Sequence, residues 1–372
     1  MNTKVIKLDS SNLEPGQIDE AAKIIDCGGL VGFPTETVYG IACQATPEAL
    51  DKLDKIKGRS GEKYYTLHIS QKSDVEKYVP HLGLIGQKLI SKCWPGPLTI
   101  VFELDDEQIE QQRNSLEQGV FESLYKNNSI GIRCPSEIIA SVLLRKTKSA
   151  VVAPSANITG DEPAVNAEQV LGRFEGKIDM LLDGGACKYK KSSTVVKIGL
   201  QGLNIQREGV YSKEELEELS KVKFLIVCTG NTCRSPMAEG LFKKYLAEKL
   251  CCEVDQLDKK GYKISSAGTM GLVGVEASGE AIQACAVKGV DIKSHKSTAI
   301  SQSLIGESDF IFTLTQSHLN QIVGLGPESK SKCQLLAQGD IPDPIGQTQE
   351  VYDSCANIIE TAVRKRIGEL LI

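Results

Sequence analysis

A thiol and a guanidinium lie six residues apart in one short segment, Cys-Thr-Gly-Asn-Thr-Cys-Arg-Ser at 228–235. The segment follows an apolar run typical of a buried strand, and Pro236 then opens a helical pattern with Ser235 as its expected N-cap. A loop between strand and helix can point several backbone N–H groups at one anion, and the helix dipole adds positive potential. These surroundings favour the thiolate of Cys228, which could displace a phosphoryl group while Arg234 and the loop amides hold its oxygens. The segment therefore predicts a cysteine-based phosphoryl-transfer site.

Two further side chains bear on this site. Asp343 lies in the sequence Ile-Pro-Asp-Pro, on a proline-stiffened loop, and is the expected donor of a proton to the leaving group. Cys233 has two interpretations: a small buried apolar side chain, or a partner that traps Cys228 in a reversible disulfide and shields it from over-oxidation. We favour the disulfide because both sulfurs belong to one loop.

A second set of cations and hydroxyls lies in the first half of the chain, close to the ends of short apolar runs. Such groups facing one cleft would suit a polyphosphate, because arginine can bind phosphate oxygens with two N–H groups. The order GxxxxGK[ST] of a P-loop is absent around Lys57, so the pattern indicates an anion site, of which a nucleotide site is one form. Equally, surface pairs of this kind are often only solvated. The set comprises Lys57, Arg59, Arg133, Ser155, Asn157, Ser193 and Arg207.

Short strands and helices alternate through this first half, which indicates an α/β or α+β class with a mixed sheet. We expect helices at 18–25, 47–56 and 85–93, and no assignment is made for the polar residues 105–129. Strands are expected at 30–33, 66–69, 98–104, 130–133, 150–153, 180–182, 194–198 and 203–206.

In the second half, apolar strands at 224–227, 264–269, 310–314 and 334–336 alternate with helices after 236 and at 277–288 and 351–371. This alternation predicts an α/β domain with a doubly wound parallel sheet. In such sheets, ligands bind at the carboxyl ends of the strands, where the segment 228–235 would lie.

Length and composition limit the possible classes of protein. The 372 residues favour two domains, which we place at 1–210 and 222–372, joined by a charged helical linker at 211–221 that begins with a capping box. A net charge of −5 gives no general case for nucleic-acid binding, and no apolar run is long enough to predict a membrane span. The twelve cysteines are scattered and the chain starts without a signal-peptide core, so we expect a reducing cytoplasm. Because the four histidines are isolated, we expect no metal site.

The motifs of the first half, in their order, closely resemble the YrdC family of threonylcarbamoyl-AMP synthases. The resemblance implies a twisted, open, mixed sheet with helices and a basic cavity. It also implies a reaction in which L-threonine, bicarbonate and ATP, with Mg²⁺, give threonylcarbamoyl-AMP and pyrophosphate. The adenylate would then pass to the tRNA-modification machinery that makes threonylcarbamoyladenosine. The matching segments are 33–40, 57–59, His68, 94–99, 131–135, 153–157 and 193–196.

Residue by residue, the same resemblance implies two sets of residues that bind substrates. This chain differs from the family's usual sequence at two places beside them: Ser60 stands where the family usually has proline, and Lys-Tyr-Tyr at 63–65 replaces a usual Asn-Pro-Leu. An alternative is that this domain only binds RNA or a nucleotide. The ATP-binding set is Lys57, Arg59, Lys63, Ser155, Asn157 and Arg207, and the threonine-binding set is Thr35, Thr37, His68, Arg133 and Ser193.

The segment 228–235 with the following Pro-Met-Ala-Glu is similar to the low-molecular-weight protein tyrosine phosphatase family, whose fold is flavodoxin-like. The resemblance implies Cys228 as nucleophile, Arg234 as phosphate ligand, Asp343 as general acid, no cofactor, and phosphorylated proteins as partners. The residues implied to support the phosphate loop are Thr229, Gly230, Asn231, Thr232, Cys233 and Ser235.

Thr232 bears on the substrate. Tyrosine-directed members usually carry isoleucine there, and threonine is similar to the protein-arginine phosphatases. Ile345 follows the Asp-Pro pair, at a place where tyrosine-directed members tend to have tyrosine and the arginine phosphatases more often have an aromatic residue, so the preference rests on Thr232. We therefore favour phosphoarginine over phosphotyrosine, with a tyrosine phosphatase or a catalytically silent phosphoprotein binder as alternatives.

Overall fold

The computed structural model describes the chain except for residues 1, 15, 60–63, 200–201 and 371–372, so Lys63, predicted to bind ATP, lies outside the described residues. Contacts between residues divide the chain into two units, Met1–Ser220 and Lys221–Ile372. None of the helices in the described part combines the length and the apolar composition needed to cross a membrane.

The first unit is built on a mixed sheet in the order β1-β8-β2-β3-β7-β4-β6-β5-β9-β10, which confirms the predicted class. Its apolar core includes α1 (Asp19–Asp26) and α6 (Ile138–Lys146), which contact each other and bury Ile25, Ile139 and Leu143. The other helices are α2 (Pro47–Lys57), α3 (Leu84–Cys93), α4 (Asp106–Ser115), α5 (Gln118–Leu124), α7 (Ala167–Phe174), α8 (Lys213–Ser220) and the 3-10 helix η1 (Lys72–Lys77). The strands are β1 (Lys4–Lys7), β2 (Val31–Phe33), β3 (Gly40–Gln44), β4 (Thr66–His68), β5 (Leu98–Glu103), β6 (Ser129–Arg133), β7 (Val151–Val152), β8 (Met180–Asp183), β9 (Thr194–Gly199) and β10 (Gly202–Arg207).

The polar stretch 105–129, left without an assignment from sequence, contains α4 and α5. A capping box starts α4: the Asp105 carboxylate accepts a hydrogen bond from Gln108 N at 2.8 Å, and the Gln108 side chain accepts one from Asp105 N at 3.2 Å. Only one apolar side chain of α4, Ile109, is buried, so the helix lacks the apolar stripe that reveals helices in a sequence.

The segment expected as a linker forms α8. Its predicted capping box is confirmed, because Ser212 N donates to the Glu215 carboxylate at 2.8 Å and Glu215 N donates to Ser212 Oγ at 3.2 Å. Leu216 is fully buried, and α8 contacts α3 and β10. This helix therefore belongs to the first unit.

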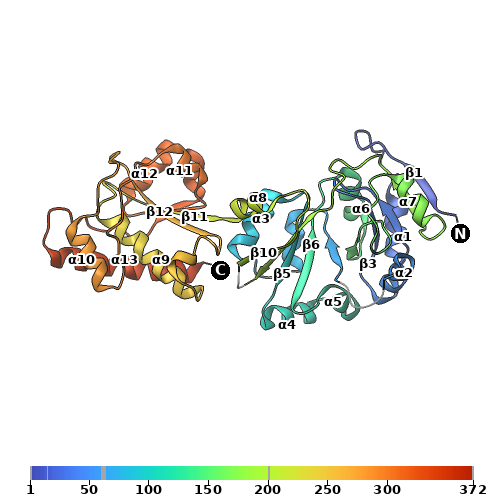
Figure 1. Cartoon of the computed structure of the whole chain (residues 1–372), viewed down its shortest axis with the longest axis horizontal. Helices are drawn as coiled ribbons and strands as arrows, with labels where there is room; N and C mark the ends of the chain where they lie inside the picture. The colour runs from blue at the N-terminus through green and yellow to red at the C-terminus, as the bar shows by residue number, and fades with distance from the viewer. Residues whose placement is uncertain (1, 15, 60–63, 200–201, 371–372) are drawn as a thin grey trace. The chain divides into compact units, whose positions relative to one another are not determined.

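The second unit is a parallel sheet in the order β12-β11-β13-β14, which confirms the doubly wound prediction. Figure 1 shows α9, α10 and α13 on one side of the strands and α11 and α12 on the other. The strands are β11 (Val222–Cys228), β12 (Tyr262–Gly268), β13 (Phe310–Thr313) and β14 (Cys333–Leu335). The helices are α9 (Arg234–Lys249), α10 (Gly279–Val287), α11 (Gln302–Glu307), α12 (Gln316–Leu325) and α13 (Gln349–Glu369), with 3-10 helices η2 (Val254–Gln256) and η3 (Pro327–Ser331).

Four phenylalanines hold one face of this sheet to α9. The ring of Phe224 lies 4.9 Å from Phe242, 5.1 Å from Phe310 and 6.4 Å from Phe312, centroid to centroid.

Because Phe224 is fully buried, we expect Phe224→Ala to lower the free energy of unfolding of the second unit by about 3–5 kcal/mol. Denaturant titration checks this, with Val287→Ala, at an 81% exposed position, as the control. A loss below about 1 kcal/mol would contradict the role of this cluster.

Candidate active sites

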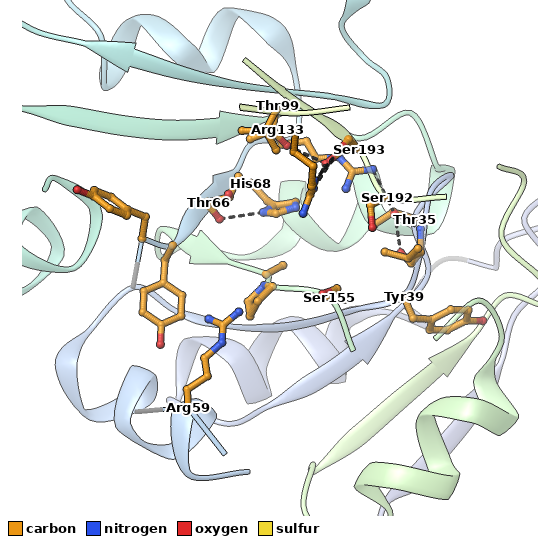
Figure 2. Close-up of a pocket in the computed structure, with 18 residues that line it drawn as sticks. Thr35, Tyr39, Arg59, Thr66, His68, Thr99, Arg133, Ser155, Ser192 and Ser193 are labelled. Carbon is orange, nitrogen blue, oxygen red and sulfur yellow. Dashed lines mark hydrogen bonds between the residues drawn. The ribbon is translucent and has the colours of Figure 1, made fainter. Parts of the chain in front are cut away.

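A row of side chains crosses the sheet of the first unit at one level. In the strand register, Arg133 on β6 lies opposite His68 on β4 and Thr99 on β5. Val195 on β9 lies opposite Thr99, and Arg207 on β10 lies opposite Val195 after a shift in register. Side chains at paired positions project to the same face of a sheet, and all five residues line one pocket (Figure 2).

Arg133 is held at the centre of this row. Its Nη2 donates to the Glu36 carboxylate at 2.8 Å, to Thr37 Oγ1 at 2.6 Å and to Thr35 Oγ1 at 3.3 Å. Glu36 also accepts a hydrogen bond from Ser136 N at 3.1 Å and is almost completely buried. Glu36 thus fixes the guanidinium, a role that the sequence analysis missed. Thr35 lines the pocket, whereas Thr37 contacts Arg133 without being part of the described lining.

Two further guanidinium groups face the same pocket. The Nε and Nη1 atoms of Arg59 are buried and have no hydrogen-bond partner among the described residues. Arg207 Nη2 donates to the carbonyl of Ser193 at 2.9 Å and to its Oγ at 3.3 Å, and burial together with the nearby Arg133 lowers the pKa of Arg207. Figure 2 shows Arg59 on the side opposite Arg133 and Ser193. Since the described lining contains no carboxylate, the pocket is suited to an anion with several charges.

Lys57 and Asn157, both predicted to bind ATP, are not part of the described lining of the pocket. Lys57 is fully buried, and its Nζ donates to the carbonyls of Ser155 and Asn157, both at 2.5 Å. Ser155 Oγ in turn lies 2.5 Å from Asn157 Oδ1. Of these three residues only Ser155 belongs to the described lining of the pocket, so Lys57 fixes the backbone that presents Ser155.

His68 is buried and uncharged. Its Nδ1 lies 3.0 Å from the carbonyl of Thr66, which only accepts, so Nδ1 carries the proton. Burial, and then the charge of Arg133, lower the pKa of His68 to about 3. The neutral ring can therefore accept a hydrogen bond at Nε2 from a ligand in the pocket.

This lowered pKa predicts a pH dependence of stability. Between about pH 6.5 and pH 3 the unfolded chain binds a proton at His68 that the folded chain does not, so His68 makes the folded state less stable as pH falls, by about 1.4 kcal/mol per pH unit. His68→Asn should remove this contribution from the curve of unfolding free energy against pH, and His81→Asn, at an exposed position, should not. Identical curves for wild type and His68→Asn would contradict the burial of an uncharged His68.

In the second unit, β11 ends at Cys228 and α9 begins at Arg234 with Cys233 as N-cap. The predicted N-cap Ser235 is therefore wrong. Its hydroxyl lies 2.9 Å from Cys228 Sγ and accepts a hydrogen bond from Asn231 Nδ2 at 2.9 Å, so it serves the sulfur rather than a backbone amide. Gly268 of β12 lets the loop pass close by, because a Cβ there would lie 2.8 Å from the carbonyl oxygen of Thr229.

Asn231 holds the loop in shape from a left-handed conformation, with φ of 54°. Its backbone N donates to Cys228 Sγ at 3.2 Å, and its Nδ2 donates to Ser235 and to Ser266 Oγ at 2.8 Å. Ser266 Oγ donates to Glu239 at 2.6 Å. Because Ser235 Oγ already accepts a hydrogen bond from Asn231, its own proton can point at Cys228 Sγ. A thiolate at Cys228 would accept this hydrogen bond.

Arg234 is nearly completely buried beside the loop. Its Nη1 donates to the carbonyl of Ile341 at 3.1 Å, and its Nη2 pairs with the half-exposed Asp343 and donates to Thr229 Oγ1 at 3.3 Å. His318 Nε2 lies 2.9 Å from the same Thr229 Oγ1, a contact that the sequence analysis did not foresee. The structure thus brings the predicted cation and acid together at one side of the loop.

Cys233 lies in a buried polar surrounding. Its Sγ contacts the hydroxyl of Tyr352 at 3.3 Å and Ser278 Oγ at 3.5 Å. These contacts connect the loop to α13 and to the start of α10. A reversible disulfide with Cys228 stays a prediction.

Comparison with known proteins finds a matching family for each of the two units. The family profile of Sua5, YciO and YrdC, described as "Telomere recombination", matches residues 23–209, and that of the low molecular weight phosphotyrosine protein phosphatases matches residues 223–371. A threonylcarbamoyl-AMP synthase of Pyrococcus abyssi is 28% identical over 237 residues, 63% of this chain and 66% of that relative, so the chain spans just under two thirds of the relative's length. A putative low molecular weight protein-tyrosine-phosphatase of Klebsiella pneumoniae is 34% identical over 140 residues, 37% of this chain and 88% of the relative.

A solved structure of Pyrococcus abyssi Sua5 shares the fold, with a TM-score of 0.50 over 89% of this chain and 98% of that one at 20% identity. By its profile matches and the 34% identical phosphatase relative, the chain belongs to the Sua5/YrdC family through its first unit and to the low-molecular-weight phosphatase family through its second.

Proposed function

We propose that the first unit is a threonylcarbamoyl-AMP synthase. The observation that carries this proposal is the convergence of Arg59, Arg133 and Arg207 on one pocket without a carboxylate in its described lining. The substrates are L-threonine, bicarbonate and ATP, all with negative groups, and the family relationship supports this choice over other anions. A domain that only binds RNA or a nucleotide is the alternative.

The reaction depends on holding the substrates next to each other and does not require a nucleophilic side chain of the protein. The amine of threonine adds to the carbon of bicarbonate and water leaves, which gives N-carboxythreonine. An oxygen of the new carbamate group, not of the α-carboxylate, attacks the α-phosphorus of ATP, and the bond from that phosphorus to the pyrophosphate oxygen breaks. Five residues that line the pocket bind the substrates in this proposal. Arg59 and Ser155 hold the phosphates, and Arg133, His68 and Thr35 hold threonine.

Mg²⁺ is expected with ATP. It prefers oxygen ligands, and the described residues of the pocket supply hydroxyls but no carboxylate. This donor set fits an ion whose ligands are mainly the phosphates of ATP and water, and which would neutralise charge on those phosphates. The adenylate, a mixed anhydride, would pass to the machinery that modifies tRNA adenosine.

We propose that the second unit is a protein phosphatase that acts on phosphoarginine. Cys228 Sγ attacks the phosphorus, an S–P bond forms and the P–N bond to the arginine breaks. Asp343, protonated for this step, gives its proton to the leaving nitrogen, and Arg234 moves from Asp343 to the phosphoryl oxygens. Water then gives a proton to the Asp343 carboxylate and attacks the phosphocysteine, the S–P bond breaks, and inorganic phosphate leaves. The contacts of Asn231 and Ser235 with the sulfur support this role of Cys228.

Thr232 is proposed to select the guanidinium. Its hydroxyl offers a polar contact that isoleucine lacks, and Ile345, which is 64% exposed, supplies no aromatic ring to pack a phenol. We expect the intact chain to dephosphorylate phosphoarginine proteins faster than phosphotyrosine proteins when both are assayed together. Thr232→Ile should shift the ratio of the two kcat/KM values toward phosphotyrosine by roughly tenfold or more, because a polar partner is lost, and Thr232→Ser should retain it. Faster turnover of phosphotyrosine by wild type would overturn the assignment to arginine.

A further inference from the structure

We propose that Tyr64 and Tyr65 form an aromatic platform on which the nucleobase of ATP stacks, next to Arg59. This inference rests on the proposed synthase function and adds the part of the nucleotide that the arginines leave without a ligand. Both tyrosines line the pocket of the first unit together with Arg59 and Ser155.

Tyr64 lines the pocket and is 58% exposed, yet its ring is anchored. Its hydroxyl accepts a hydrogen bond from Asn127 Nδ2. Asn127 lies in the tight turn before β6 in a left-handed conformation, with φ of 48°, where Lys126 and Ser129 pair with each other. The hydroxyl end of the ring is thus held by a distant segment, while much of the side chain stays accessible to a ligand.

Tyr65 forms the buried part of the platform. Its hydroxyl donates to the Asp54 carboxylate, and the guanidinium carbon of Arg59 lies 5.5 Å from the ring centroid. Burial, and then Asp54, raise the pKa of Tyr65, so the ring stays neutral. The backbone N of Arg59 donates to the carbonyl of Asp54 at 3.0 Å, which ties the cation and the ring to the same end of α2.

Among the described residues that line the pocket, these two rings are the groups that suit the nucleobase. A nucleotide has an anionic part and a flat aromatic part. Cations and hydroxyls dominate the rest of the described lining and suit phosphates and a carboxylate. Tyr39, a further aromatic residue of the lining, is fully buried, and its hydroxyl donates to the carbonyl of Gly185 at 2.7 Å. Tyr64 is therefore the accessible aromatic face, and stacking of a base on such a face strengthens binding about 5- to 150-fold.

Two probes separate base binding from phosphate binding. Calorimetric titration of the intact chain with ATP and with inorganic tripolyphosphate gives two dissociation constants for each variant. We expect Tyr64→Leu to weaken ATP binding by about tenfold and to leave tripolyphosphate binding unchanged. Tyr64→Phe keeps the ring and should retain most of the affinity for ATP, whereas Arg59→Ala should weaken both ligands.

Each other outcome has a distinct meaning. Unchanged ATP binding in Tyr64→Leu, or an equal loss for ATP and tripolyphosphate, would overturn the platform and leave the synthase proposal in place. Failure of the wild-type chain to bind either ligand would overturn the proposed synthase function itself.

Discussion

Cys228→Ser will reduce protein dephosphorylation by the intact chain by roughly four orders of magnitude or more. The reason lies in the contacts of the sulfur: Asn231 N, at 3.2 Å, and the hydroxyl of Ser235, at 2.9 Å, are placed to stabilise a thiolate. A serine hydroxyl does not ionise under the same conditions and is a far weaker nucleophile toward phosphorus. Release of inorganic phosphate from a phosphorylated protein measures the loss.

The matched control is Cys251→Ser, which changes an exposed thiol of the same unit and should keep full phosphatase activity. Both variants should unfold at the denaturant concentration of wild type. If Cys228→Ser retained a tenth or more of the wild-type rate, Cys228 would not be the nucleophile.

Arg133→Lys will lower synthesis of threonylcarbamoyl-AMP by about a hundred- to a thousandfold. Arg133 donates from one nitrogen to Glu36, Thr35 and Thr37, and it lies opposite His68 and Thr99 in the strand register. Lysine keeps the charge but cannot reproduce the planar fork, so the buried carboxylate of Glu36 would lose its partner geometry.

Pyrophosphate release that depends on threonine and bicarbonate measures this effect. A rise in KM for threonine with little change in KM for ATP is expected, since Arg59 and Ser155 are proposed to hold the phosphates. Arg145→Lys, at an exposed position of α6, is the control and should behave as wild type. Wild-type activity of Arg133→Lys would remove Arg133 from the substrate site.

Most of the fold could be predicted because apolar periodicity marks strands and helices that bury a face. The helices at 105–129 could not, since α4 has one buried apolar side chain and depends on the Asp105–Gln108 capping box. Arg207 was predicted as a site residue, but its place in the sheet could not be predicted, for another reason. A shift in register between Ile205 and Arg207 places Arg207 opposite Val195, and no spacing rule reveals such a shift.

The candidate sites were predictable where residue type alone carries the chemistry, as for Cys228 and Arg234. The supporting contacts were not. Glu36 and His318 reach their partners across 97 and 89 positions of sequence, respectively, and such contacts arise only from folding. For Ser235 only the expected N-cap role was wrong, because serine before proline is a common N-cap; its hydroxyl instead lies beside Cys228 Sγ and Asn231, as expected for a residue that supports the phosphate loop.

Formation of labelled threonylcarbamoyl-AMP tests most directly whether the chain carries a synthase site that is separate from the site around Cys228. The intact chain would be incubated with ATP, L-threonine and ¹³C-bicarbonate, and the product followed by mass spectrometry in wild type, Cys228→Ser and Arg133→Lys. We predict equal product from wild type and Cys228→Ser, and little from Arg133→Lys. No labelled adenylate from the wild-type chain, or its loss in Cys228→Ser, would contradict two separate active sites.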